Sequence, residues 1–327
     1  MHDPPPGHVR PPIGSSRASS DDDKDRLMKA VRFSRFGAPD VLELVDLPDP
    51  HPAAGQVRIA VRAAGLNTSD WKKRQGLMDQ ELPQTMGYEA AGIVDEIGAG
   101  VTDVAVGDRV FGFTAASGAQ AEHAVLANYV PIPPSLDFAT AAALPSAVET
   151  AARGLDQLGV EQGNTVLING ASGAVGAAAV QLAVARGARV IGTASAASHE
   201  FLRSLRAEPV AYGDGMPERV RALAPDGVDR ALDVAGSGVL GELVELAGGP
   251  EHVITLADWA GAQRHGVRFS SGDAGRALYS LALVARLIEA GQFVVQVGRT
   301  FPLSDVAEAH RVGEAGSVRG KLVLLIE

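Results

Sequence analysis

A glycine-rich turn between two apolar runs is the feature that most constrains the fold of this chain. Residues 165–195 read TVLINGASGAVGAAAVQLAVARGARVIGTAS. The apolar run Val166–Ile168 leads into the glycines, a helical pattern of small and aliphatic residues follows, and Arg189–Ile191 forms a second apolar run. This order predicts a strand, a helix and a second, parallel strand, with the glycines where the first strand passes into the helix.

Glycines at such a turn point to a bound dinucleotide. They let the backbone approach a pyrophosphate, which the N–H groups and the positive dipole end of the following helix can hold. The spacing is G-x-x-G-x-x-G rather than G-x-G-x-x-G, so the flanking strands and helix are needed for the interpretation. The alternative is a turn whose glycines serve only close helix–sheet packing, a role expected of Gly176 in either case. The predicted cofactor contacts in this turn are Gly170, Ser172, Gly173, Ala174, Val175 and Gly176.

The end of the second predicted strand indicates which dinucleotide binds. An NAD enzyme usually has Asp or Glu about twenty residues past the glycines, where it binds the ribose 2′-hydroxyl. This chain has no carboxylate there before Glu200 and carries hydroxyl groups at Thr193, Ser195 and Ser198. These residues favour the 2′-phosphate of NADPH. The alternative is an ordinary polar loop, because no neighbouring arginine completes a phosphate site.

Charge and composition exclude several classes of function. The 327 residues include 39 acidic and 29 basic ones, for a net charge of −10, so the chain does not resemble a nucleic-acid-binding protein. No run reaches the roughly 18 apolar residues that cross a membrane. Without cysteine the chain has no disulfide and no cysteine-bound zinc. We therefore expect a soluble, cytoplasmic protein that binds neither nucleic acid nor membrane.

The first 27 residues differ from the rest of the sequence. They are rich in Pro, Ser and Asp and contain no apolar run of the signal-peptide type. The string DDDKDR resembles the cleavable leader of an expression vector, and Met28 then reads as the natural start. We expect residues 1–27 to be disordered.

The remaining sequence changes character twice. Residues 28–147 contain short apolar runs separated by Gly, Pro and Asp, which is typical of β-structure. Residues 148–272 alternate between strands and helices, which predicts an α/β fold with a doubly wound parallel sheet. Residues 273–327 indicate a long helix near 275–290, a short β segment and a closing strand at 321–326. Beyond the first βαβ unit, the expected elements of the alternating part are 199–205, 209–212, 217–223, 228–234, 239–246, 252–256 and 267–269.

Six strings in the sequence resemble one known family. They are AAGLNTSDWKKRQG at 63–76, GYEAAGIVDEIGAGV at 87–101, VGDRVFGF at 106–113, AAALPSAVETA at 141–151, NGASGAVG at 169–176 and RGKLVLLI at 319–326. Together they resemble the medium-chain dehydrogenases/reductases, and most closely the zinc-independent, zeta-crystallin-like quinone oxidoreductases. The resemblance implies a Rossmann domain at 148–272 and a GroES-like β-rich catalytic domain at 28–147, to which 273–327 return. It also implies a nicotinamide in the cleft between the domains and a homodimer.

The same resemblance argues against a metal. Zinc alcohol dehydrogenases have Cys where this chain has Asn67, and His where it has Tyr88. A catalytic zinc takes three protein ligands of the Cys, His or Asp/Glu type, which these positions do not supply. Without a Lewis acid, the expected hydride acceptors are electron-poor quinones and α,β-unsaturated carbonyls, whose developing negative charge the protein stabilises.

Three residues are candidates for that stabilisation. By analogy, Tyr88 faces the nicotinamide, where its phenol would protonate an enolate or act only as an aromatic wall. Asn67 and Asp70 share a face if their segment is helical; Asn67 would then contact substrate or ribose, and Asp70 would brace or cap the turn. Lys72 stands where several family members have a tyrosine, and is either a proton donor or a solvated surface lysine.

Further cofactor contacts follow from the resemblance, position by position. Thr150 matches a threonine near the nicotinamide and the phosphates, and Lys321 matches a lysine at the nicotinamide end. Tyr212 follows the third Rossmann strand, where a tyrosine packs beside the 2′-phosphate. For Tyr212 and Lys321, ordinary packing or a surface position is the alternative. The loops at the carboxyl ends of the later strands add Val234, Thr255 and Leu256.

Three functions remain open at this point. The first is an NADPH-dependent, metal-free reductase of small-molecule quinones or activated alkenes. The second is an enoyl or ketone reductase dedicated to one biosynthetic intermediate, a choice governed by the surroundings of Leu77, Met78, Phe113, Asp258 and Trp259. The third is a protein that binds NADPH without turnover.

Overall fold

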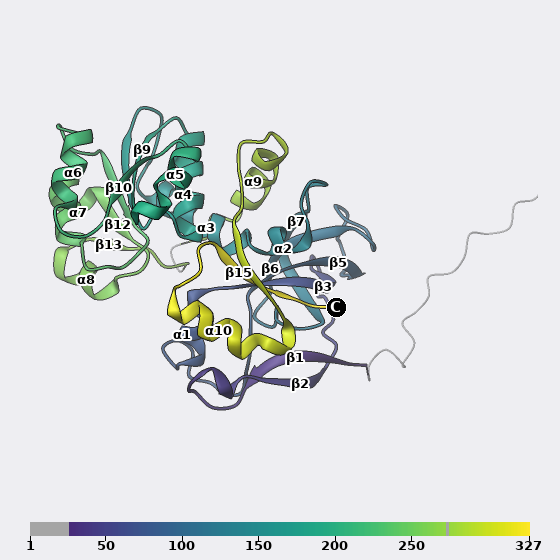
Figure 1. Ribbon diagram of the computed structural model, residues 1–327. Coiled ribbons are helices and arrows are strands. Elements are labelled where there is room, and N and C mark those ends of the chain that lie inside the picture. The colour runs from purple at the N-terminus through teal and green to yellow at the C-terminus, as the bar shows by residue number, and fades with distance from the viewer. Residues whose placement is uncertain (1–25, 273–274) are drawn as a thin grey trace, which may run out of the picture.

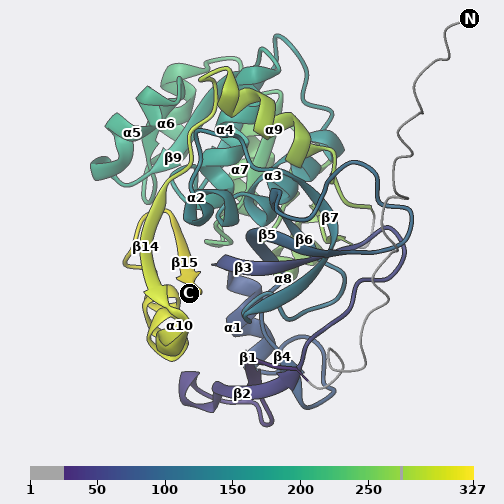
Figure 2. The same cartoon turned by 90° about the vertical axis from the view of Figure 1, so that its right-hand side faces the viewer.

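The computed structural model describes residues 26–272 and 275–327 (Figure 1). Residues 1–25 of the predicted leader lie outside the described residues, so the expected disorder of that segment stays a prediction. The expectation is wrong for its last two residues: Leu27 begins the first strand, and the carbonyl oxygen of Arg26 accepts the N–H of Asp49 at 3.0 Å. The chain forms two bodies. One, in teal and green, holds the middle of the chain, and the other combines the purple and blue N-terminal strands with the yellow C-terminal segment (Figures 1 and 2).

The teal and green body is built on a six-stranded parallel sheet. Each pair of neighbouring strands is parallel, so the predicted doubly wound sheet is confirmed. Both faces of the sheet are covered: Val166 and Ile168 of one strand join one apolar cluster, and Leu167 between them joins another. In spatial order the strands are β10 (Glu208–Ala211), β9 (Arg189–Ala194), β8 (Thr165–Asn169), β11 (Arg230–Asp233), β12 (Val253–Thr255) and β13 (Arg268–Phe269).

Helices cover both faces of this sheet. Most lie close to their expected positions, but α8 was not expected, and the long helix before the return begins at Ser280 rather than near 275. The helices of this body are α3 (Pro145–Gln157), α4 (Ala174–Ala185), α5 (His199–Ser204), α6 (Met216–Leu223), α7 (Leu240–Ala247), α8 (Trp259–His265) and α9 (Ser280–Glu289).

The other body joins both ends of the chain in one sheet. Its strand order is β14-β15-β3-β5-β6-β7, and an additional β3–β7 pairing closes a barrel. The closing strand β15 pairs antiparallel with β3, so the C-terminal end of the chain returns to the body that contains the N-terminal strands (Figure 2). These strands are β3 (Val57–Leu66), β5 (Glu89–Ile97), β6 (Arg109–Thr114), β7 (His123–Pro131), β14 (Val297–Pro302) and β15 (Lys321–Leu325).

A smaller sheet and three helices complete this GroES-like body. The small sheet consists of β2 (Glu43–Pro48), β1 (Leu27–Phe33) and β4 (Gln84–Thr85). Helix α10, between β14 and β15, was not expected from the sequence. The three helices are α1 (Thr68–Arg74), α2 (Phe138–Ala142) and α10 (Val306–Ala315).

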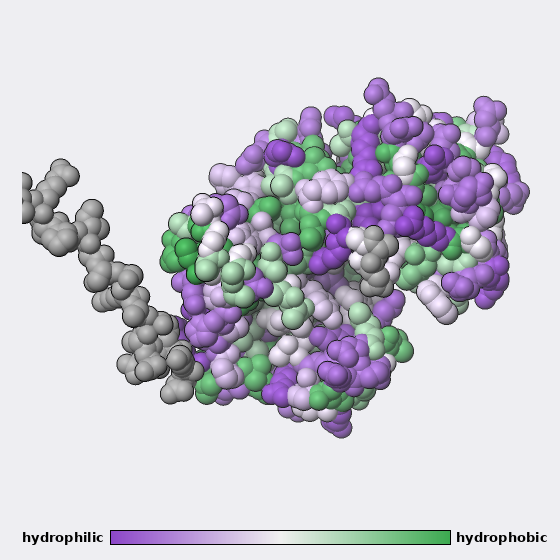
Figure 3. Space-filling model, turned by 180° about the vertical axis from the view of Figure 1, so that it is seen from behind, coloured by the Kyte–Doolittle hydropathy of each residue, from purple (hydrophilic) through white to green (hydrophobic). Residues whose placement is uncertain are grey.

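The chain passes between the two bodies at two places. The first lies at α2 and α3, and the predicted boundary between residues 147 and 148 falls inside α3. The second is the segment between α9 and β14 (Figure 1). Seen from behind, the surface carries interspersed polar and apolar residues, with a notch between the two bodies (Figure 3). Within the described ranges, no helix combines the length and apolar character needed to cross a bilayer.

Candidate dinucleotide site and active site

The three glycines after β8 have different structural roles. Gly170 has φ +84°, and a Cβ there would lie 2.9 Å from the Cβ of Ala235. Gly176 lies so close to the turn that a Cβ would meet the carbonyl oxygen of Gly170 at 2.2 Å. Around Gly173, the N-cap of α4, no atom comes closer than 3.7 Å to a Cβ. The turn therefore needs Gly170 and Gly176 for its own packing and leaves Gly173 on an open face.

A row of buried polar side chains crosses the carboxyl ends of four neighbouring strands. The hydroxyl of Thr193 donates to Asn169 Oδ1 at 2.6 Å, and Asn169 Nδ2 donates to Asp233 Oδ1 at 2.9 Å. Thr255 donates to the other oxygen of Asp233 at 2.7 Å. Thr193 also accepts the N–H of Gly170 at 3.0 Å, which ties the row to the glycine turn. The row positions the loops at the edge where open parallel sheets bind ligands.

This row changes the role expected of two predicted residues. The Thr193 side chain is only 1% exposed and its hydroxyl proton is directed to Asn169, so it is not free to donate to a 2′-phosphate. Thr255 is fully buried, and its hydroxyl braces Asp233 rather than facing a cofactor. Asn169 and Asp233 were not singled out from the sequence, because their partners lie on other strands.

Two pockets meet at the glycine turn. The first, here called the outer pocket, has an empty volume of about 840 Å³ and includes Gly170, Ser172, Thr193 and Tyr212 in its lining. The second, here called the cleft pocket, lies between the two bodies and has an empty volume of about 820 Å³. Both include Gly170, so they adjoin across the turn. The predicted residues that line the cleft pocket are Asn67, Gly170, Gly173, Ala174, Val175, Gly176, Val234 and Lys321.

A buried charged network forms the catalytic-domain side of the cleft pocket. Lys321 Nζ lies 2.6 Å from Glu89 Oε1 and donates to Asn67 Oδ1 at 2.5 Å. Asn67 Nδ2 donates to the same Glu89 oxygen at 2.7 Å, and the N–H of Ser146 donates to the other oxygen at 2.6 Å. The Glu89 carboxylate fits only because residue 65 is glycine: a Cβ at Gly65 would lie 2.4 Å from Glu89 Oε1.

The hydrogen bonds within this network determine which polar groups remain available to a ligand. Asn67 already uses both of its polar atoms, so its first role in the structure is to hold Lys321 and Glu89. Lys321 has three N–H groups, and two of them point to Asn67 and Glu89 within the described part of the chain. One N–H group of Lys321 is therefore available to a ligand in the cleft pocket. Glu89 was missed from the sequence because it stands inside an apolar strand pattern.

Asp70 caps the helix that carries Asn67. Its carboxylate accepts the N–H of Asn67 at 2.8 Å at the first turn of α1, as the capping alternative predicted. The side chain is fully buried, and this burial raises the pKa of Asp70 to about 7. The remaining carboxylate oxygen, Oδ1, is without a hydrogen-bond partner in the described part of the protein. Asp70 therefore acts first as a brace.

Tyr88 lies half-buried beside this network, immediately before Glu89. Burial, with smaller contributions from Asp70 and Asp79, raises the pKa of its phenol to about 12. The ammonium group of Lys73 lies 5.0 Å from the centre of the Tyr88 ring, where a cation is attracted to the ring face. The phenol is consequently a neutral hydrogen-bond donor at ordinary pH.

The lysine that contacts Tyr88 is not the one predicted. Lys72 is exposed on α1, in agreement with the solvated alternative, and lines neither the outer nor the cleft pocket. Lys73 is 5% exposed, and its Nζ donates to the carbonyl oxygen of Thr85 at 2.8 Å and to Ser117 Oγ at 2.9 Å. The expectation that Lys72 reaches the substrate is therefore not supported by its placement.

Several other predicted residues lie outside the two pocket linings. Thr150 is half-buried on α3, where its hydroxyl lies 3.4 Å from Glu149 Oε2. Ser195 and Ser198 follow β9, with their hydroxyl oxygens 3.2 Å apart. The remaining members of this group are Tyr88, Lys72, Thr255 and Leu256.

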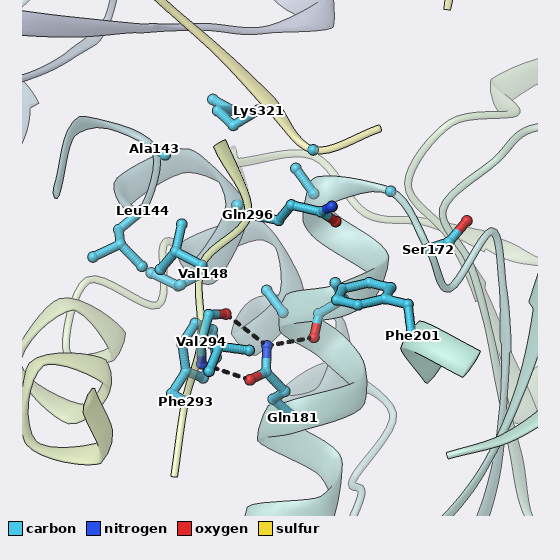
Figure 4. A pocket seen from close by; sticks show the side chains of 17 residues that line it. Ala143, Leu144, Val148, Ser172, Gln181, Phe201, Phe293, Val294, Gln296 and Lys321 are labelled. Atoms are coloured by element: carbon cyan, nitrogen blue, oxygen red, sulfur yellow. Dashed lines mark hydrogen bonds between the residues drawn. The ribbon is translucent and has the colours of Figure 1, made fainter. Parts of the chain in front are cut away.

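An apolar pocket adjoins the glycine turn on the side of α3 and α4 (Figure 4). It is lined by Leu144, the N-cap of α3, by Val148 of α3, and by Phe201 and Phe293. At its edge the Gln181 amide donates to the carbonyl oxygen of Val294 at 3.1 Å and accepts the N–H of Val294 at 2.8 Å. Gln181 thereby binds α4 to the second crossing between the two bodies.

The donor set at Asn67, Tyr88 and Glu89 does not fit a zinc ion. At the two positions compared with zinc enzymes the chain offers an amide, Asn67, and a phenol, Tyr88. The adjacent carboxylate, Glu89, is already bound by Lys321, Asn67 and Ser146. No group of three His, Cys, Asp or Glu side chains arranged for a metal occurs among residues 26–272 and 275–327. The glycine turn and its two pockets, by contrast, fit an extended dinucleotide.

Comparison with known proteins agrees with this geometry. Residues 53–134 match the alcohol dehydrogenase GroES-like domain, and residues 205–324 match the zinc-binding dehydrogenase family. The chain is 31% identical to the rat (Rattus norvegicus) quinone oxidoreductase over 92% of this chain and 98% of the relative. It is 33% identical to 2-methylene-furan-3-one reductase of tomato (Solanum lycopersicum) over 91% of this chain and 79% of the relative.

Solved structures show the same architecture. The mycobacterial protein Rv1454c complexed with NADPH is 28% identical and superposes with a TM-score of 0.77, over 91% of this chain and 99% of that chain. The likeness therefore includes both bodies and the cleft between them. The chain belongs to the quinone oxidoreductase family of the medium-chain dehydrogenases/reductases, oxidoreductases that bind a nicotinamide cofactor.

Proposed function

We propose that this protein is an NADPH-dependent oxidoreductase that reduces quinones or α,β-unsaturated carbonyls without a metal. The observation that carries the proposal is the meeting of the outer and cleft pockets at Gly170. This path runs from Tyr212 on one side to Lys321 on the other, with the open face of Gly173 beside it. A dinucleotide along it would place its adenosine by Tyr212 and its nicotinamide, which supplies the hydride when bound, near Lys321.

The loop after β9 supports NADPH rather than NADH. No carboxylate follows this strand before Glu200, which is exposed on α5. Ser195 is half-buried and directly follows Ala194, which lines the outer pocket together with Tyr212. Tyr212, 63% exposed, offers a ring face there. A carboxylate at Ser195 would repel a 2′-phosphate, whereas a hydroxyl can donate to it. The NADPH in the mycobacterial relative is consistent with this preference.

Tyr88 and Lys321 support reduction of an acceptor whose oxygen becomes negative. The Tyr88 phenol is protonated at ordinary pH, so it can donate a hydrogen bond to that oxygen, or a proton once negative charge has developed there; its pKa, raised to about 12, makes it a weaker acid than a free phenol. Lys321 contributes a buried positive charge and orients the ribose next to the nicotinamide through its available N–H group. These residues need no Lewis acid, and no step of the proposed reaction uses one.

A second candidate is a reductase dedicated to one enone intermediate. The tomato relative is named for such a substrate, which favours this alternative. Leu77, Met78 and Trp259 are exposed apolar side chains available to select an acceptor. Phe113 is buried and Asp258 caps α8 through the N–H of Gly261, so neither faces solvent freely.

One screen tests the proposal. NADPH and NADH consumption are followed with 9,10-phenanthrenequinone, a small enone panel and simple aldehydes. Faster consumption of NADPH with quinone supports the proposal, and a marked preference for a single enone supports the dedicated reductase. Fluorescence of bound NADPH without turnover on any acceptor would identify a binding protein instead. The homodimer and the cytoplasmic location stay predictions.

A further inference from the structure

A basic residue from the far end of the chain lies against the loop after β9. Arg319 Nη2 donates to the carbonyl oxygen of Ala197 at 3.1 Å, across 122 residues of sequence. Ala197 stands in the turn between Ser195 and Ser198, whose hydroxyl oxygens lie 3.2 Å apart. We propose that Arg319 binds the 2′-phosphate of NADPH, and that the catalytic body thus supplies the charge that selects this cofactor. This inference rests on the proposed use of NADPH.

The guanidinium group has the bonding capacity that this role needs. Arginine carries five N–H donors in a planar fork, which matches the oxygens of a phosphate. One of these donors is directed to Ala197, and the side chain is exposed. No ion pair joins Arg319 to an acidic side chain in the part of the chain that the structure describes. Its contact with the uncharged carbonyl oxygen is weaker than a contact with a phosphate, in which both partners carry charge.

The loop itself lacks a cation that would serve instead. Between the end of β9 and Glu200 the sequence contains Ala, Ser and one His, but no Lys or Arg. Ser195 offers a half-buried hydroxyl group, whereas Ser198 is only 3% exposed and its hydroxyl oxygen lies against that of Ser195. Hydroxyl groups do not neutralise the charge of a phosphate. Arg319 supplies the positive charge that the loop lacks. The sequence around the loop could not reveal it, because Arg319 lies 122 residues further along the chain.

The position of Arg319 also follows from the backbone at its neighbour. Gly320 has φ +91°, and a Cβ there would lie 2.5 Å from the carbonyl oxygen of Gln296. Arg319 and Lys321 flank this glycine, so their Cα atoms are at most about 7 Å apart. Their side chains nevertheless reach opposite bodies: Arg319 contacts Ala197, and Lys321 contacts Glu89. Residues 319–321 thus send one side chain to each end of the proposed cofactor path.

The test compares Arg319→Gln with Arg311→Gln, using the full chain. Arg311 is an exposed arginine of α10, and its Nη1 lies 3.2 Å from Glu308, so it controls for the loss of a surface charge. Dissociation constants are measured for NADPH, NADH and adenosine 2′,5′-bisphosphate. Loss of a charge-assisted contact predicts that Arg319→Gln weakens NADPH and the bisphosphate about ten- to a hundredfold and leaves NADH unchanged. Arg319→Lys should lose less, because it keeps the charge without the fork.

The outcomes separate this inference from the proposed function. Equal weakening of NADPH and NADH, or no change in NADPH binding, would show that Arg319 is not a 2′-phosphate ligand, even if the wild-type protein prefers NADPH. A wild-type protein that binds NADPH and NADH equally would overturn both the coenzyme preference and the role of Arg319. Binding is measured without an acceptor, so a failure of turnover leaves this test intact.

Discussion

Lys321 and Glu89, 232 residues apart in the sequence, form a buried ion pair with 2.6 Å between Nζ and Oε1. Glu89 lies on β5 and Lys321 begins β15, the strand that brings the end of the chain back beside β3. The Glu89 side chain is 0% exposed and the Lys321 side chain 6% exposed, so water solvates neither charge. The pair therefore links the formation of the catalytic sheet to the wall of the cleft pocket.

Removal of one partner of this pair should destabilise the protein strongly. Lys321→Met leaves Glu89 buried without its cation, and we expect the free energy of unfolding to fall by about 3–5 kcal/mol, measured by urea denaturation. The double variant Lys321→Met/Glu89→Gln should recover part of that loss, because no buried charge remains unpaired. Equal losses in the single and double variants would contradict this account.

Asp70 should make stability depend on pH around neutrality. Its folded pKa of about 7 lies above the unfolded value of about 3.9. Between these values the folded protein holds a proton that the unfolded chain has released, so this contribution is full at low pH and is lost as pH rises through 7. Asp70→Asn removes this titration.

Thermal and denaturant unfolding at pH 5 and pH 8 check the Asp70 prediction. The stability of Asp70→Asn relative to wild type should increase by about 2–3 kcal/mol from pH 5 to pH 8. A difference in stability that is the same at both pH values comes from the altered hydrogen bond to Asn67, and it does not affect this test. Parallel pH profiles would mean that Asp70 is not protonated in the folded protein.

Two glycines of the turn should respond differently to the same substitution. Gly176→Ala places a Cβ 2.2 Å from the carbonyl oxygen of Gly170, and we expect a loss of at least about 1–3 kcal/mol of stability. Gly173→Ala meets nothing within 3.7 Å and should fold normally. Its methyl group would stand on the open face, where we propose the pyrophosphate, and should weaken NADPH binding roughly tenfold or more. Melting temperature and NADPH fluorescence separate the two effects, and unchanged NADPH affinity in Gly173→Ala would speak against the proposed path.

Tyr88→Phe tests the phenol as donor. Loss of the hydroxyl should lower kcat on an enone about ten- to a hundredfold, while KM for NADPH stays near its wild-type value, because the group acts on the acceptor. Tyr129→Phe is a suitable control, since the Tyr129 hydroxyl bonds Asp103 at an exposed position. A full rate in Tyr88→Phe would exclude the phenol as the donor.

Ser195→Asp should exchange the preferred coenzyme. A carboxylate after β9 would repel the 2′-phosphate of NADPH and would accept a hydrogen bond from the 2′-hydroxyl of NADH. We expect NADPH binding to weaken at least about tenfold and NADH binding to hold or improve. Titration of both coenzymes measures the exchange, with Ser204→Asp as a control on the surface of α5, where Ser204 is exposed. Loss of affinity for both coenzymes would indicate a disturbed loop.

Local patterns were enough to predict most of the parallel sheet. Apolar runs followed by Gly and Pro, as at Val166–Ile168, place β8 to β13 within a few residues of their observed bounds. Helix α10 was missed because its buried face includes Ala309 and His310 rather than a stripe of large apolar residues. The burial of His310 beside Arg74 depends on tertiary packing, which no local pattern contains.

The site was predictable where it is local and hidden where it joins distant segments. The glycine turn and the Asn67–Asp70 cap follow from residues a few positions apart. The partnerships of Glu89 with Lys321, of Asn169 with Asp233 and of Arg319 with Ala197 each join separate strands or bodies. Lys72 and Lys73 are neighbours in sequence, and only the direction of α1 decides which of them contacts Tyr88.

The Gln181 side chain has a consequence for motion. Its amide bonds both the N–H and the carbonyl oxygen of Val294, as a neighbouring strand would. The second crossing is therefore fixed to α4 at Val294. The other crossing is the two-residue link Ala143–Leu144 between α2 and α3. A swing of one body against the other must bend at that link and, at the second crossing, either about residues 295–297, beyond the Gln181 contact, or after that contact is released.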